Sequence, residues 1–110
     1  MEKSSLTALA RQLLDQARES SSGRTARTVF GGHAHTLRQT VIAIKAGQKL
    51  DDHENPGEAT LQVLHGRVRL AAGDVSWEGS PGDLLVVPPS LHSLEALDDA
   101  VVLLTVAKLD

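Results

Sequence analysis

The sequence contains no cysteine and very few aromatic residues. Without cysteine, disulfides, thiolate zinc sites and cysteine nucleophiles are all excluded. Aromatic residues make up only 2% of the 110 positions, so the core must be built from leucine, valine, isoleucine and alanine. A chain of this length predicts one domain with a single core.

The sequence also lacks a long apolar run and a strong excess of either charge. The formal net charge is -3, which does not favour binding to nucleic acid or to an acidic membrane surface. We therefore expect no nucleic-acid partner and no membrane partner. No segment predicts a signal peptide or a transmembrane helix, and a cytoplasmic location is the default expectation.

The first twenty residues predict an amphipathic helix over residues 4–19. Their apolar side chains recur at helical spacing, at Leu6, Ala10, Leu13, Leu14 and Ala17. Ser4 or Ser5 can cap the first turn, and Arg11 and Asp15 are spaced as an i,i+4 ion pair. The helix is expected to lie on the domain or on a partner subunit. The run SSSG at residues 20–23 ends it, which divides the chain into a helix with linker, residues 1–23, and a β-domain, residues 24–110.

From residue 24 onward the apolar pattern changes to a period of two, which is typical of strands with one buried face. Turn signals separate the strands, at Gly73-Asp74, Ser80-Pro81-Gly82 and Asp98-Asp99. About seven or eight short strands at nearly regular spacing favour an all-β fold, an antiparallel sandwich or jelly-roll barrel.

Two segments resemble the conserved motifs of the cupins. The segment GQKLDDHENPGEATLQVLHG, residues 47–66, is similar to the first motif, and PGDLLVVPPSLHSL, residues 81–94, is similar to the second. The resemblance covers roughly residues 28–107 and implies a cupin-type jelly-roll barrel. It extends to very small single-domain, RmlC-like cupins of bacteria, most of which have no assigned activity.

The resemblance implies a metal site that has lost some of its ligands. Cupins with a metal usually hold it with three histidines and a glutamate. Here His53 falls on the first histidine and His92 on the histidine of the second motif, whereas Asn55 replaces the second histidine and Ala59 replaces the glutamate. Two of the four ligands remain.

Two nearby residues are candidates for the missing ligands. Glu58 would face outward in a regular strand, but a bulge at Pro56-Gly57 would turn it inward. His35 belongs to a His-x-His pair with His33 at the mouth of an early strand. With His53 and His92, either would complete a loose site for zinc, nickel or iron. The alternative is a domain that holds no metal.

Three functions therefore stay open. The first is a small-molecule binding module, in which Asn55 and Gln62 supply polar contacts and Arg38 receives an acidic group. The second is a metal-dependent enzyme of the dioxygenase or isomerase type. The third is a structural protein without a cavity. In each case we expect a homodimer in which the helix or the early strands cover an exposed sheet edge.

Overall fold

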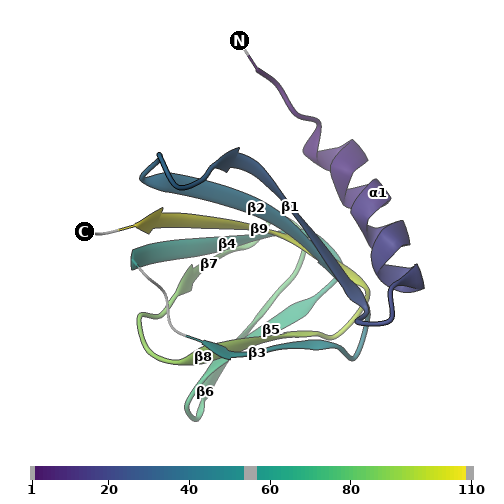
Figure 1. Cartoon of the computed structure of the whole chain (residues 1–110). Helices are drawn as coiled ribbons and strands as arrows, with labels where there is room; N and C mark the ends of the chain where they lie inside the picture. The colour runs from purple at the N-terminus through teal and green to yellow at the C-terminus, as the bar shows by residue number, and fades with distance from the viewer. Residues whose placement is uncertain (1, 54–56, 109–110) are drawn as a thin grey trace.

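A computed structural model describes residues 2–53 and 57–108, and within them the chain forms one helix and nine strands (Figure 1). The helix is α1 (Leu6–Glu19). The strands are β1 (Arg24–Gly31), β2 (Leu37–Ile44), β3 (Lys49–His53), β4 (Gly57–His65), β5 (Val68–Ala72), β6 (Val75–Gly79), β7 (Leu84–Val87), β8 (His92–Ala96) and β9 (Ala100–Lys108). In this part of the chain no helix is long and apolar enough to cross a membrane.

The strands form two antiparallel sheets that face each other, as the jelly-roll prediction requires. The larger sheet has the order β1-β2-β9-β4-β7 and the smaller one the order β3-β8-β5-β6. The expected all-β class and jelly-roll arrangement are confirmed, although the two sheets stay separate and do not close into one barrel. Strand β3 was not predicted, because its sequence KLDDH is mostly charged and shows no apolar alternation.

The main core lies between the two sheets and is entirely aliphatic. It contains Ile44, Leu61, Val63, Val68, Leu70, Leu94, Val102 and their buried neighbours. On β4, Ala59, Leu61 and Val63 are buried while the residues between them are more exposed, so the alternation seen in the sequence does separate the inner face from the outer one. Burial of these side chains supplies the main driving force for folding.

Helix α1 packs on the outer side of the larger sheet (Figure 1). Its buried residues are Leu9, Ala10, Leu13, Leu14 and Ala17, and beneath them lie Val41, Ala43, Val101 and Leu103 of β2 and β9. The Ser5 side chain accepts a hydrogen bond from the Ala8 amide at 3.2 Å, which caps the first turn as expected. The helix therefore covers its own sheet, and its apolar face is not available to a partner subunit.

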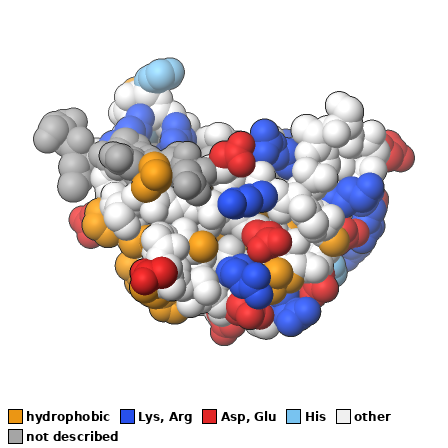
Figure 2. Space-filling view, turned by 90° about the horizontal axis from the view of Figure 1, so that it is seen from below, with side chains coloured by type: hydrophobic (Ala, Val, Ile, Leu, Met, Phe, Trp, Pro, Cys, Tyr) orange, Lys and Arg blue, Asp and Glu red, His pale blue; other side chains and the backbone are white. Residues whose placement is uncertain are grey.

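The outer face of the smaller sheet is covered with paired charges (Figure 2). Arg67 contacts Asp98 at 3.1 Å, and Arg69 contacts Glu78 at 3.4 Å and Glu95 at 3.5 Å. Acidic and basic side chains are interspersed across this side of the molecule in Figure 2. Such exposed pairs contribute little stability, but they keep the face hydrated and apart from the core.

Gly66, the glycine that ends the first motif, is required by the turn between β4 and β5. Its φ of +73° is a conformation that favours glycine, and a Cβ at this position would collide with the carbonyl oxygen of Asp99. The motif glycine thus lets the β4–β5 turn approach the β8–β9 turn. It serves the backbone and not a ligand.

Asp99 joins three parts of the fold. Its carboxylate accepts a hydrogen bond from the Ala46 amide at 2.8 Å and another from Arg18 Nε at 2.8 Å. The Ala46 amide, and then the Arg18 guanidinium, lower the pKa of this carboxyl. A carboxyl whose pKa is lower in the folded state stabilises the protein above its unfolded pKa, and that contribution disappears as the pH falls through the folded value.

We expect Asp99→Asn to lower the melting temperature by a few degrees at pH 7, because the side chain loses its charge toward Arg18. At a pH below the folded pKa of Asp99 the variant and the wild type should melt together, since both side chains are then neutral. Thermal unfolding at pH 7 and in strong acid checks this. Asp74→Asn, an exposed aspartate in the β5–β6 turn, is the control. An equal loss at both pH values would contradict the electrostatic explanation.

Candidate functional site

A small cavity lies between the two sheets, inside the main core. Its volume is about 90 Å³, and it is lined by Ile42, Leu50, Leu61, Leu70, Val87, His92, Leu94 and Leu104. The lining comes from both sheets, so the cavity is part of the space that the jelly roll encloses. Apart from His92, every side chain in this lining is aliphatic.

His92 is the polar side chain of this cavity. It is the first residue of β8, separated from the Pro88-Pro89 corner by Ser90 and Leu91, and it is 3% exposed. Its Nδ1 lies 2.9 Å from the carbonyl oxygen of Ser90. Because a carbonyl can only accept, Nδ1 must carry the proton, and in the neutral ring Nε2 is then the acceptor. The Ser90 contact therefore fixes both the tautomer and the orientation of the imidazole.

The role of Ser90 was not predicted from the sequence. It acts through its backbone carbonyl, and the sequence gives no signal for which carbonyl a ring nitrogen will meet. The sequence does indicate that His92 points inward, because it alternates in β8 with the same parity as the buried Leu94 and Ala96.

The backbone of His53 lies opposite His92. Strands β3 and β8 are paired with Leu50 opposite Leu94 and His53 opposite His92, and the register shifts between these two pairs. Without this bulge residue 52 would lie opposite His92, so the bulge decides which residue of the first motif meets the second. The side chain of His53 lies outside the part of the chain that the structure describes, and Asn55 lies outside it altogether.

Glu58 and Gln62 are not in the cavity. Strand β4 pairs with β9 without a register shift from Gly57 to Val63, so the bulge that would turn Glu58 inward is absent there. Both side chains are exposed, on the face opposite to Ala59 and Leu61. Regular strand alternation places both on the outer face, away from the cavity, and their roles as metal ligand and polar contact stay predictions.

His33 and His35 lie in the loop between β1 and β2, and both are exposed. The His35 ring packs edge-on against Phe30, with ring centroids 5.3 Å apart, and neither histidine lines the cavity. Arg38 lies opposite Val106, a residue of the main core, so it belongs to the inner face of the larger sheet, where it is half-buried. It does not line the cavity itself.

The described residues do not by themselves fit a metal ion. Among residues 2–53 and 57–108, as far as the structure describes their side chains, no three histidine, aspartate or glutamate groups lie close enough together to hold one. A protein zinc site needs about three or four ligands. What the described side chains offer chemically is one oriented imidazole in an otherwise aliphatic lining.

No family model matches this sequence, and no curated protein matches it. Solved structures do match. An RmlC-like cupin protein from Desulfovibrio desulfuricans superposes with a TM-score of 0.75, at 27% identity over 97% of both chains. A conserved protein of unknown function from Streptococcus pyogenes gives 0.73, at 25% identity over 83% of this chain and 79% of that one.

A cupin superfamily protein from Desulfitobacterium hafniense gives a TM-score of 0.72, at 15% identity over 78% of each chain. These likenesses agree with the two sequence motifs, the first of which includes β3 and β4 and the second β7 and the start of β8. The chain folds as a small RmlC-like cupin domain.

Proposed function

We propose that this protein binds a small molecule in the cavity between the sheets, with His92 as its polar contact. The single observation that carries the proposal is the buried, oriented imidazole in an otherwise aliphatic cavity. Binding sites of this kind are mostly apolar, with a few fixed polar groups that orient the ligand.

The cavity limits the size and the chemistry of the ligand. A volume of about 90 Å³ is well below the roughly 300–1,000 Å³ of most small-molecule sites, so only a very small ligand fits. The ligand should therefore have a short aliphatic body and one group that hydrogen bonds to the imidazole.

The test is a titration of ¹⁵N-labelled protein with isobutyrate and with isobutanol, followed by NMR. We expect both to shift the amide signals of Leu70, Leu94 and Leu104. His92→Leu places an apolar side chain of similar size at this position but removes the hydrogen bond to the ligand, so binding should weaken by about tenfold. His33→Leu, an exposed histidine, is the matched control. No shifts with either probe, or unchanged binding by His92→Leu, would refute the proposal.

The homodimer remains a proposal, with a different surface from the one predicted. Helix α1 is occupied by its own sheet, whereas Leu84 and Val86 on the edge strand β7 are 61% and 75% exposed. An uncharged, exposed edge strand is a site of association. Sedimentation at micromolar concentration should show a dimer, and Val86→Lys should give a monomer. A monomeric wild type would exclude this assembly.

A further inference from the structure

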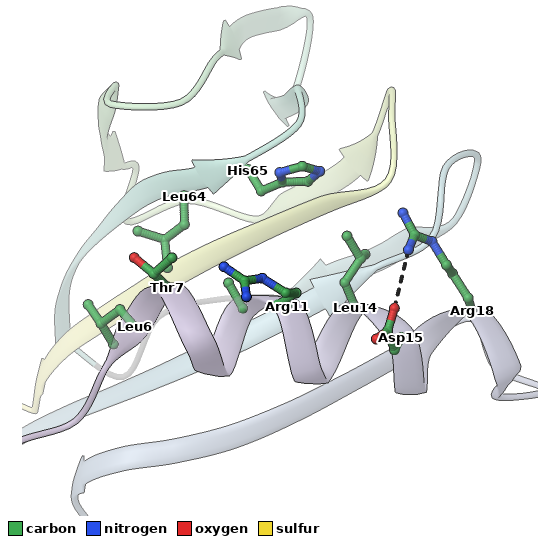
Figure 3. Close-up of a pocket in the computed structure, with 9 residues that line it drawn as sticks. Leu6, Thr7, Arg11, Leu14, Asp15, Arg18, Leu64 and His65 are labelled. Carbon is green, nitrogen blue, oxygen red and sulfur yellow. Dashed lines mark hydrogen bonds and ion pairs between the residues drawn. The ribbon is translucent and has the colours of Figure 1, made fainter.

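A second hollow lies outside the sheets, between helix α1 and strand β4 (Figure 3). This groove has a volume of about 380 Å³ and is lined by Leu6, Thr7, Ala10, Arg11, Leu14, Asp15, Arg18, Leu64 and His65. It shares none of these residues with the cavity of His92. Its volume is near the lower end of the range of small-molecule sites, which is roughly 300–1,000 Å³.

The two arginines that line the groove differ in their ion pairs. Arg18 contacts Asp15 at 3.4 Å and Asp99 at 2.8 Å, so two carboxylates neutralise it. The sequence predicted that Asp15 would pair with Arg11, which is wrong, because Asp15 turns toward Arg18 one helical turn further on. Arg11 makes no hydrogen bond or ion pair with any residue that the structure describes. The charges of these four side chains sum to zero, but the Arg11 guanidinium keeps no ion-pair partner among the described residues.

Among the other side chains of the groove, the leucines supply an apolar surface and His65 supplies a polar one. Leu6, Leu14 and Leu64 supply aliphatic surface from the helix and the strand. Figure 3 shows the Arg11 guanidinium extending from the helix toward the side of the groove where Leu64 lies, with His65 on the strand side. The His65 side chain, like that of Arg11, has no hydrogen-bond partner among the described residues. An imidazole and a guanidinium thus border one apolar space.

We infer that this groove binds a small organic monocarboxylate with an aliphatic body. The planar guanidinium of Arg11 matches a carboxylate in a bidentate way, and the leucines would cover the aliphatic chain. The one guanidinium without an ion pair matches one carboxylate. A multiply charged anion is disfavoured, because Asp15 and Asp99 lie around Arg18 at the other end of the groove. The charges of the groove therefore select the class of ligand.

The test is an NMR titration of ¹⁵N-labelled protein with hexanoate and, separately, with hexanol. We expect hexanoate to shift the amide signals of α1 and of Leu64 and His65, and hexanol to bind about tenfold more weakly or not at all, since it lacks the charge. Arg11→Gln should weaken hexanoate binding by about tenfold as well. Arg11 is exposed, so the substitution retains the folded state.

The controls separate this site from the other one. Arg69→Gln makes the same change of charge on β5 of the smaller sheet and should bind hexanoate like the wild type. His92→Leu should also leave the shifts of α1 unchanged, so that failure of the cavity proposal would not affect this one. Hexanol binding as tightly as hexanoate, wild-type affinity in Arg11→Gln, or no shifts in α1 at millimolar hexanoate would each overturn the inference.

Discussion

Leu13→Ala is expected to lower the free energy of unfolding by about 2–5 kcal/mol, the usual range for deletion of a buried leucine side chain. Leu13 is 2% exposed and lies at the centre of the contact between α1 and the larger sheet. The space it leaves cannot close easily, because the Thr25 hydroxyl donates a hydrogen bond to the Leu13 carbonyl at 2.8 Å and holds the helix in place. The variant should therefore keep its fold but contain a cavity.

Urea unfolding followed by circular dichroism measures this effect. Leu91→Ala is the matched control, because Leu91 is 50% exposed in the loop before β8 and its truncation should change the stability by less than about 0.5 kcal/mol. A loss below about 1 kcal/mol for Leu13→Ala would mean that α1 does not unfold together with the sheets. The helix would then be an appendage and not part of the single domain.

The sequence was sufficient to predict an element and its buried face where side-chain periodicity decides both. The spacing of Leu6, Ala10, Leu13, Leu14 and Ala17 predicts a helix, and the last four of these five are buried in it. The alternation in β4 predicts its inner face correctly, from Ala59 to Val63. Periodicity is a local property, because each element must turn its apolar side chains toward one core.

The sequence was not sufficient where distant residues decide the structure. The partner of Arg18 is Asp99, which is 81 positions away in the chain, and so the pairing of Asp15 with Arg18 instead of Arg11 could not be read from spacing alone. The bulge in β3 depends in the same way on its pairing with β8. Nothing in KLDDH shows where the register shifts, although the shift determines which residue lies opposite His92.

The histidines of the two motifs carry the last prediction, which concerns metal binding. Their backbones are opposite one another in β3 and β8, and imidazole is a ligand that zinc, nickel and iron all accept. A third ligand was expected from Glu58 or His35. Glu58 is on the outer face of β4, and His35 is exposed against Phe30. Two histidines without a carboxylate make a poor site.

We therefore expect the purified protein to bind a divalent transition metal only loosely, and His53→Ala and His92→Ala each to abolish that binding. Glu58→Ala is the informative control, since a residue on the outer face should leave the affinity unchanged. Calorimetric titration of the wild type and the three variants with zinc, nickel and iron measures this.

Tight binding that is lost in Glu58→Ala would show that β4 changes register around a metal. Equal binding by the wild type and both histidine variants would place the metal elsewhere. If the wild type binds none of the three metals, the first motif has kept its fold but not its ligands, and His92 is left to the small-molecule cavity.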